Sequence, residues 1–510
     1  MESESVKNKR IAKNTVFLYA RTLLIMLVSL YTSRIVLKAL GVDNYGVYDV
    51  VGGFVAMFAI VTSPISNAIS RFLIYGLGKG DLEHLKKVYS TSVNILLLLG
   101  LIVVLIGETF GIWFLNQKLN IPPESMTAAN WVLQCSIFST VLGLINIPNS
   151  ATIIAHEKMS IYAYMSILEA CLKLGLAFSV LYLPFNSLIT YAIGLLIISL
   201  ILRASYVIYC SSKFQECKYT FGIDKKLFKE MTGFAWWTFL GNTAFIFNNQ
   251  GSAMLMNIFF GVVINTAKGL AATVQSAVMN LINSFTTAFT PQITKSYAEG
   301  NFQYMYSVMS RGSKFSVFIM LLFLIPLEFE APIVLKLWLG EVPPFATLFL
   351  RLTLLCSFTN LIGTPFLQGI MATGKIKKYQ IAMTLIGCTV FPLTWLTYKL
   401  GGAVQMFYWI FVIIYNILIW VRMIYVQELL GYKVKKFAVE VFLPILRCTI
   451  LSAIPGIIIS YLMEDSYLRL IVLTLVTLIF SSLIIYRLGM TNGERNFIMT
   501  KIKNRLNYGY

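Results

Sequence analysis

Long apolar segments recur from one end of the chain to the other, and they restrict its fold more than any other feature. The chain has 510 residues, of which 57% are hydrophobic and only 12% are charged. A soluble domain needs more charge than this to cover its surface, whereas about 20 consecutive apolar residues form a helix that spans a bilayer. The sequence therefore predicts an all-α polytopic membrane protein.

Fourteen segments are apolar and long enough to be predicted as transmembrane helices. Their approximate bounds are 14–38, 46–72, 88–115, 128–154, 160–183, 186–210, 234–260, 264–290, 312–335, 345–371, 379–399, 402–427, 441–462 and 467–488. The first segment follows a basic stretch, as in a signal peptide, but it is too long for one and Arg21 interrupts it. We interpret it as the first spanning helix.

Basic residues are distributed unequally between the two sets of loops that join these helices. One set contains most of the loop lysines and arginines, and the other contains only Lys38, Lys118, Lys336, Lys399 and Arg469. Because cytoplasmic loops are enriched in Lys and Arg, we expect both termini in the cytoplasm. The scatter of the basic residues over many loops also disfavours nucleic acid as the reason for the net charge of +19.

An internal duplication is visible between the two halves of the chain. The residues Pro148, Ala155, Lys158 and Tyr162 recur, at identical spacing, as Pro365, Ala372, Lys375 and Tyr379. Upstream of each set lies a pair of prolines, Pro122–Pro123 and Pro343–Pro344. Internal repeats in a polytopic membrane protein are typical of transporters that work by alternating access.

The repeat unit is predicted to contain six helices, so that both copies enter the membrane in the same direction. We expect an N-terminal lobe at 1–210, a cytoplasmic linker at 211–233 and a C-terminal lobe at 234–427. Helices 13 and 14 and a basic cytoplasmic tail, at 428–510, remain outside the two parallel repeats.

No catalytic motif is recognisable in the sequence. It contains no nucleotide-binding loop, no nucleophile elbow and no cluster of His, Cys and Asp at metal-ligand spacing. The seven cysteines lie mostly inside apolar segments without framework spacing, so they are predicted to be core thiols. We expect a protein that is not an enzyme and that needs no cofactor or metal.

Several cationic residues lie in or at the ends of the predicted helices. Each costs about 2.5–3.5 kcal/mol at a helix centre, so such a residue normally faces a watery cavity or a partner. Arg21, Arg34, Arg71 and Lys268 are candidates for a substrate cavity, with contact to lipid headgroups as the alternative. Arg203, Arg422 and Arg447 lie near inner helix ends and are expected to reach the headgroups.

Glu169 lies one helical turn before Lys173 in the middle of helix 5. Residues at this spacing are neighbours on a helix surface, so a structural ion pair is the expected arrangement. A role for Glu169 in proton coupling is the alternative.

Neutral polar residues align on one face of several predicted helices. In helix 8, Ser276, Asn280, Asn283 and Thr287 share a face, and Ser63, Asn67 and Ser70 do so in helix 2. Helix 7 adds Asn242 and Asn249. We expect the asparagines at 67, 242, 249, 280 and 283 to line a hydrophilic cavity, and hydrogen bonding between helices is the alternative.

Four stretches carry a resemblance to a known family. They are Asn14 to Gly46 with Leu40-Gly41-Val42 and Tyr45-Gly46 at its end, Ser70-Arg71-Phe72, Ala155-His156-Glu157-Lys158, and Pro291-Gln292-Ile293 through Tyr297-Ala298-Glu299-Gly300. With fourteen helices, the chain resembles the polysaccharide-biosynthesis flippases of the multidrug/oligosaccharidyl-lipid/polysaccharide exporter superfamily. The resemblance covers nearly the whole chain.

This resemblance implies a V-shaped pair of six-helix bundles in the bacterial cytoplasmic membrane. The implied substrate is an undecaprenyl-pyrophosphate-linked oligosaccharide that moves from the inner to the outer leaflet. The family's cavity is cationic, and Arg21 and Lys268 match it best by helix position, while Arg71 matches a family arginine at the end of helix 2. The expected partners are the bilayer, the lipid-linked oligosaccharide, and a polysaccharide polymerase with other assembly proteins; we expect a monomer and no nucleic acid.

Three other functions compete with this interpretation. A cation-coupled multidrug exporter of the same superfamily needs an acidic cavity, and the intramembrane acids Glu108, Glu169 and Glu328 are fewer than the cations. A glycan polymerase or ligase needs a large outer loop with catalytic residues, which the sequence lacks. A non-transporting scaffold of a glycan-assembly complex is the third.

Overall fold

The computed structural model describes residues 4–58, 62–79, 81–156, 158–220, 222, 224–287 and 289–496. The side chains of some helical residues also lie outside the described part, among them Arg21, Asn67, Arg71 and Asn242. Every regular element in the described part is a helix, so the prediction of an all-α chain is confirmed there.

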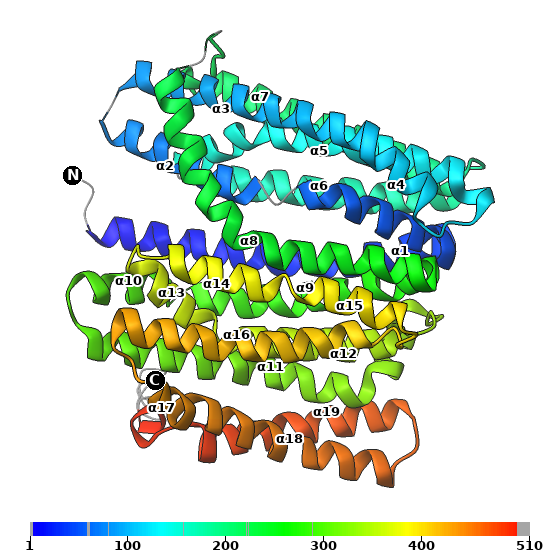
Figure 1. The fold of residues 1–510 in the computed structure, drawn as a ribbon, viewed down its shortest axis with the longest axis vertical. Helices are drawn as coiled ribbons and strands as arrows, with labels where there is room; N and C mark the ends of the chain where they lie inside the picture. The colour runs from blue at the N-terminus through cyan, green and yellow to red at the C-terminus, as the bar shows by residue number, and fades with distance from the viewer. Residues whose placement is uncertain are drawn as a thin grey trace. The chain divides into compact units, whose positions relative to one another are not determined.

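The elements follow one another with short connections. They are α1 (Glu4–Ala56), α2 (Thr62–Lys79), α3 (Leu82–Ile106), α4 (Ile112–Gln117), α5 (Met126–Ala155), α6 (Met159–Tyr182), α7 (Ser187–Lys213), α8 (Lys225–Phe260), α9 (Val262–Thr287), α10 (Thr290–Ala298), α11 (Phe302–Leu339), α12 (Ala346–Leu361), α13 (Thr364–Ala372), α14 (Lys377–Gly387), α15 (Val390–Lys399), α16 (Met406–Leu430), α17 (Val434–Phe437), α18 (Leu443–Leu462) and α19 (Tyr467–Ile484). Figure 1 shows them along the chain.

Eleven helical segments in the described part are long and apolar enough to cross a membrane. The predicted spans 46–72, 234–260 and 264–290 are largely helical as well, but no separate segment among the eleven corresponds to them. In α9 the reason is composition, because its polar side chains lower the mean hydropathy. The count of fourteen spans and the repeat layout therefore stay predictions.

The chain divides into two compact units. The first contains Met1–Thr273, Pro343–Ala346 and Thr384–Phe407, and the second contains Val274–Val342, Thr347–Met383 and Tyr408–Tyr510. The division into lobes at 1–210 and 234–427 stays a prediction.

In the first unit, α1 changes direction at Gly41. This glycine has a φ of 76° and a ψ of 173°, a conformation that glycine adopts without steric cost. Figure 1 shows α1 in dark blue as two helical stretches that meet at this point. As a result, one helix contributes two separate stretches to the same unit, where it packs against α5 and α6.

Shortly after this bend, α1 comes very close to the start of α9 at Gly46. A Cβ atom at Gly46 would collide with the carbonyl of Val262 and lie 2.8 Å from the hydroxyl of Thr266. The same hydroxyl donates a hydrogen bond to the carbonyl oxygen of Val42. Only glycine permits this approach of the two helices.

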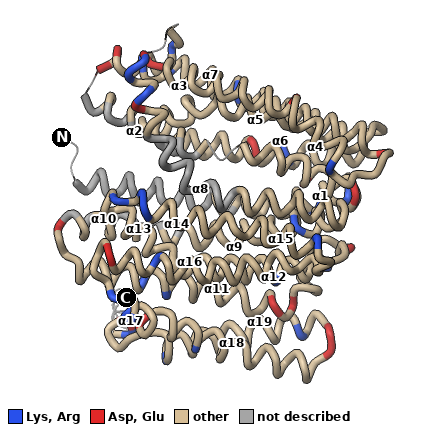
Figure 2. Tube along the Cα trace, viewed as in Figure 1, with Lys and Arg blue, Asp and Glu red and all other residues tan. Residues whose placement is uncertain are grey.

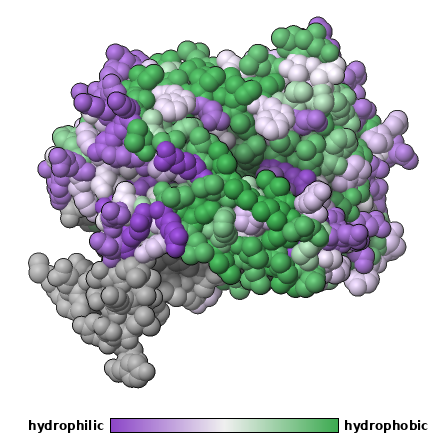
Figure 3. Space-filling model, turned by 90° about the horizontal axis from the view of Figure 1, so that it is seen from below, coloured by the Kyte–Doolittle hydropathy of each residue, from purple (hydrophilic) through white to green (hydrophobic). Residues whose placement is uncertain are grey.

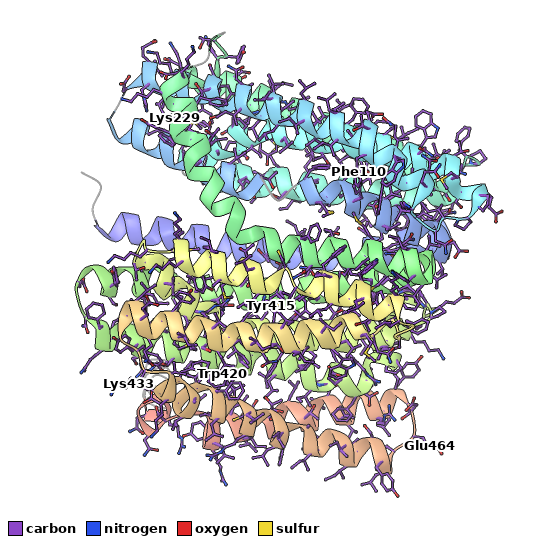
Figure 4. All side chains as sticks on the ribbon, viewed as in Figure 1. Phe110, Lys229, Tyr415, Trp420, Lys433 and Glu464 are labelled. Atoms are coloured by element: carbon purple, nitrogen blue, oxygen red, sulfur yellow. The ribbon has the colours of Figure 1, made fainter. Side chains whose placement is uncertain are left out.

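Aromatic rings join α1 to the end of the α3–α4 segment. Phe110 lies in the π-helical turn Gly107–Gly111 between α3 and α4 and stacks on Phe114 with ring centroids 5.6 Å apart. Phe54 of α1 stacks on Phe114 at 5.9 Å. Figure 4 labels Phe110 on this part of the chain.

The segment between α7 and α8 is bonded to the rest of the first unit. Asn94 of α3 donates to the carbonyl of Gly222 at 2.8 Å and accepts from the hydroxyl of Tyr219 at 2.8 Å. At the end of α5, the Nε2 atom of His156 lies 2.5 Å from a carboxylate oxygen of the buried Glu216. The described residues of this segment therefore form a strap along α3 and α5.

Two arginines that were expected to reach lipid headgroups have partners inside the protein. Arg203 of α7 donates to the carbonyl of Ile145 at 2.8 Å. Arg422 of α16 is 8% exposed and donates to the hydroxyl of Tyr379 at 2.8 Å. The headgroup prediction is wrong for Arg422, because its side chain is buried and bonded within the second unit. For the half-buried Arg203 it stays a prediction.

In the second unit, the helical hairpin of α18 and α19 packs along α11. Its outward side carries large exposed apolar residues, among them Ile450, Ile457, Ile471, Leu475 and Ile479. Figure 3 shows one face of the molecule, on which hydrophobic residues dominate the centre and hydrophilic residues gather toward the two ends. Such a surface suits contact with lipid.

Candidate functional site

Two cavities lie in the first unit, and they share part of their walls. Their volumes are about 510 and 460 Å³. The residues common to both are Tyr48, Asp49, Glu169, Lys173 and Tyr191. Cavities of this size are within the range that accommodates small organic ligands.

The first cavity is lined mainly by the two stretches of α1. Before the bend, the lining positions on α1 have helical spacing and include Ser29, Thr32 and Ser33. After the bend at Gly41, Tyr45, Tyr48 and Asp49 line the same space. The local reversal of the chain thus supplies both hydroxyl groups and a carboxylate from a single helix.

The second cavity is rich in hydroxyl groups from α5 and α7. Ser136, Ser139 and Thr140 come from α5 and Ser199 from α7, while Gln250 comes from α8. The Oγ atom of Ser139 is buried and has no hydrogen-bond partner within the protein. A polar ligand in this cavity would supply one.

Tyrosine rings separate the two cavities. Tyr48 and Tyr191 have ring centroids 5.1 Å apart at an interplanar angle of 73°, and Tyr45 lies 6.4 Å from Tyr48. The arrangement is edge-to-face, which is a favourable geometry for aromatic pairs. It combines an apolar ring surface with phenolic hydroxyls, each of which both donates and accepts.

The predicted ion pair of α6 forms beside these rings. The Nζ atom of Lys173 lies 2.6 Å from a carboxylate oxygen of Glu169, and both side chains are 43% exposed. Figure 2 shows an acidic and a basic position close together along α6. The ion-pair interpretation of the spacing is confirmed, and a coupling role for Glu169 stays a prediction.

Asp49 is a cavity residue that sequence reasoning missed. Its carboxylate packs against Gly269 of α9, where an added Cβ would lie 2.6 Å from one oxygen, and it interacts electrostatically with Lys268. Lys268 also donates to the carbonyl of Asn249 at 2.8 Å. The sequence does contain a signal for this residue, because Asp49 is an acidic residue within the predicted span at 46–72.

The structure brings only some of the predicted site residues together. Lys268 and Asn249 are bonded to each other in the first unit, but neither lines the two cavities. Arg34 is exposed and is not a lining residue. Asn280 and Asn283 are exposed on the part of α9 that belongs to the second unit. The side chains of Arg21, Arg71, Asn67 and Asn242 lie outside the described residues.

The charged groups at the cavities nearly balance. Asp49 and Glu169 contribute two carboxylates to the lining, Lys173 contributes an ammonium group, and Lys268 interacts with Asp49 from α9. In the described ranges, no group of His, Cys, Asp and Glu has a geometry that could hold a metal ion. The chemistry available is therefore hydrogen bonding and ring contact around the ion pair of Glu169 and Lys173 and the carboxylate of Asp49.

Comparisons with known proteins show a fold relationship only. No protein-family model matches the chain, and no curated protein matches its sequence. An inward-facing multidrug resistance transporter of the MATE family, in the MOP superfamily, matches with a TM-score of 0.67 and 14% identity over 82% of this chain and 98% of that one.

Two further solved structures have the same fold. The lipid II flippase MurJ in an inward closed conformation has a TM-score of 0.66 and 17% identity, over 92% of this chain and 99% of that one. A MOP-superfamily transporter from Pyrococcus furiosus, described as having a binding pocket of reverse polarity, has a TM-score of 0.60 and 16% identity, over 82% and 96%. The chain thus has the fold that these MATE and MurJ structures share.

Proposed function

We propose that this protein is an alternating-access flippase that moves an undecaprenyl-pyrophosphate-linked oligosaccharide from the inner to the outer leaflet of a bacterial cytoplasmic membrane. The observation that carries the proposal is the pair of adjoining polar cavities within a unit of apolar helices. Hydroxyl groups, tyrosines, the ion pair of Glu169 and Lys173 and the carboxylate of Asp49 line these cavities. A lipid-linked glycan requires both a polar cavity and an apolar surface, because its sugars need polar contacts while its tail stays in lipid.

The lining of the cavities suits sugars better than it suits a diphosphate. Sugar hydroxyls both donate and accept hydrogen bonds, as do the serines and threonines of the lining, and sugar rings pack on tyrosine faces. A diphosphate needs an excess of cationic donors, whereas here Asp49 and Glu169 balance Lys173 and Lys268. The diphosphate is assigned instead to the predicted cations Arg21, Arg34 and Arg71.

The extent of the fold similarity favours the flippase over the exporter. The lipid II flippase matches 92% of this chain, against 82% for the MATE transporter. The difference is about the length of one helical hairpin, such as that of α18 and α19. In the proposed cycle, the apolar outward side of this hairpin stays in lipid beside the polyprenyl tail.

A cation-coupled multidrug exporter is the second candidate, and Asp49 favours it. Asp49 is an intramembrane acid in addition to Glu108, Glu169 and Glu328, and it adds a second carboxylate to the lining beside Glu169. Of the other acids, Glu108 already accepts a hydrogen bond from Gln134 at 2.9 Å. The two candidates differ in the expected ligand, which is a glycan for the first and an organic cation for the second.

The cellular setting of the proposal follows from the sequence. We place both termini in the cytoplasm and expect a monomer that cooperates with a polysaccharide polymerase and other assembly proteins. A non-transporting scaffold in such a complex would need no working cavity.

Flipping can be measured in vesicles that contain the purified protein and a fluorescent polyprenyl-diphosphate oligosaccharide, with a membrane-impermeant quencher outside. We expect the wild-type protein to equilibrate the probe between leaflets. The double variant Glu169→Gln/Lys173→Gln removes the ion pair at the wall shared by the cavities. Because this changes the contacts of the glycan, we expect the rate to fall by at least about tenfold, which corresponds to about 1.4 kcal/mol.

The matched control is Glu83→Gln/Lys86→Gln, which removes an ion pair of 3.2 Å on the surface of α3. Its flipping rate should equal that of the wild type. Transport of an organic cation such as ethidium, driven by a proton or sodium gradient and without glycan flipping, would support the exporter. The absence of both activities would support the scaffold.

A further inference from the structure

The outer end of the C-terminal hairpin is fixed to α11 by a buried ion pair. Glu330 of α11 is fully buried, and Arg469 in the first turn of α19 is 6% exposed. The Nε atom of Arg469 donates to one carboxylate oxygen at 2.8 Å and an Nη atom donates to the other at 3.3 Å. Asp465, in the turn before α19, forms a second ion pair with the same guanidinium group. The contact is bidentate, which fixes both distance and orientation.

A second buried ion pair joins the other end of the same helix to the segment after α19. Lys314 of α11 is 3% exposed, and its Nζ atom lies 2.9 Å from a carboxylate oxygen of Glu494. The same oxygen accepts from the backbone of Thr491 at 2.8 Å, which closes the turn that carries it. Arg311 approaches the other carboxylate oxygen at 3.7 Å.

The two ion pairs are far apart along α11. Lys314 and Glu330 are separated by sixteen positions, or about 24 Å at about 1.5 Å per residue. This is most of the roughly 30 Å thickness of a hydrocarbon core. The contact between α11 and the hairpin is therefore fixed near both of its ends.

Between the ion pairs, glycines of the hairpin side fit against rings of α11. A Cβ atom at Gly456 of α18 would collide with the ring of Phe329, and one at Gly489 would lie 2.6 Å from the ring of Phe318. These close fits leave no room for the hairpin to slide along α11 without repacking.

The bonded stretch of α11 contains an intrinsic weak point. Pro326 lies inside the helix between Lys314 and Glu330, and Pro332 follows just beyond. Proline cannot donate the helical hydrogen bond, and it is a common site of bending. A helix with this sequence would flex there if nothing held the turns on either side.

We propose that the hairpin of α18 and α19 is a brace that holds α11 in one conformation across Pro326, so that the three helices behave as one rigid body. Buried ion pairs contribute little net stability compared with apolar packing, but the loss of one partner is strongly destabilising. Two such pairs at opposite ends therefore select one register and one orientation of the hairpin. This proposal does not depend on which substrate the protein carries.

Hydrogen exchange of the full-length protein in lipid nanodiscs tests the brace. The peptides to follow cover α11 around Pro326 and the first turns of α19. Glu330→Gln leaves the buried Arg469 with only its ion pair to the exposed Asp465, and Glu494→Gln leaves the buried Lys314 without a carboxylate. We expect exchange around Pro326 to rise at least about tenfold in both. The double variant Glu330→Gln/Arg469→Gln leaves no unpaired buried charge, since Asp465 is exposed, and should exchange more slowly than Glu330→Gln.

The matched control is Glu464→Gln, at an exposed acid in the turn between α18 and α19 that Figure 4 labels. It should exchange like the wild type. If Glu330→Gln does not yield folded protein, Arg469→Lys is measured in its place. This variant keeps the charge but loses the bidentate contact, and we expect exchange around Pro326 to rise several-fold. Unchanged exchange around Pro326 in the ion-pair variants, or the same increase in the control, would overturn the brace.

Discussion

Replacing Asp49 with asparagine is expected to lower the thermal stability of the protein more than any other single change at the cavities. The substitution leaves the ammonium group of Lys268 without its carboxylate, although its bond to the carbonyl of Asn249 remains. Loss of one partner of a buried pair costs about 3 kcal/mol at the lower end of the usual range. We take the lower end because Asp49 is only partly shielded in the cavity wall.

Thermal unfolding in detergent, followed by the fluorescence of a thiol-reactive dye at the buried cysteines, measures this effect. The double variant Asp49→Asn/Lys268→Gln should recover much of the lost stability, since no charge then lacks a partner. Asp43→Asn is the matched control, because Asp43 is exposed on the same helix and should tolerate the change. If Asp49→Asn and Asp43→Asn lowered the melting temperature equally, the role assigned to Lys268 would be contradicted.

Replacing Gly46 with valine is the second change with a large expected effect. The new side chain would collide with the backbone carbonyl of Val262 and with the hydroxyl of Thr266. Overpacking typically costs about 1–3 kcal/mol, and we expect the upper end because a backbone atom cannot rotate away. Gly46→Ala should also lower the stability, but by less, because alanine adds only one methyl group.

Gly52 provides the control for this prediction. It lies on the same helix, and a Cβ atom there would meet nothing within 4 Å. Gly52→Ala should therefore leave the melting temperature within a degree or two of the wild type or raise it slightly, since alanine favours helix. A similar loss at both positions would show that helix propensity or lipid contact, rather than the approach to α9, determines the result.

The sequence was sufficient to predict features that depend on spacing within one helix. The ion pair of Glu169 and Lys173 followed from their separation by one turn, and the all-α class followed from the apolar segments. Both are local properties. Helix bounds were less accurate where a helix extends beyond its apolar segment, as in α11, which begins after the N-cap Asn301, ten residues before the predicted span at 312–335.

Contacts between distant parts of the chain could not be predicted in this way. Asp49 and Lys268 interact although they lie on different helices, and Glu330 pairs with Arg469, which the loop rule placed at the outer surface. The glycine at position 46 contributed to the family resemblance, but only the structure shows that the carbonyl of Val262 requires it. No periodicity encodes such pairs, because they depend on which helices become neighbours.

The strap between α7 and α8 has a consequence for engineering this protein. Connecting loops are normally the preferred sites for inserted tags and protease cleavage sites. Here an insertion between Tyr219 and Gly222 would break the bonds that both residues make with Asn94 on α3. A label that replaces the exposed side chain of Glu464 avoids these bonds.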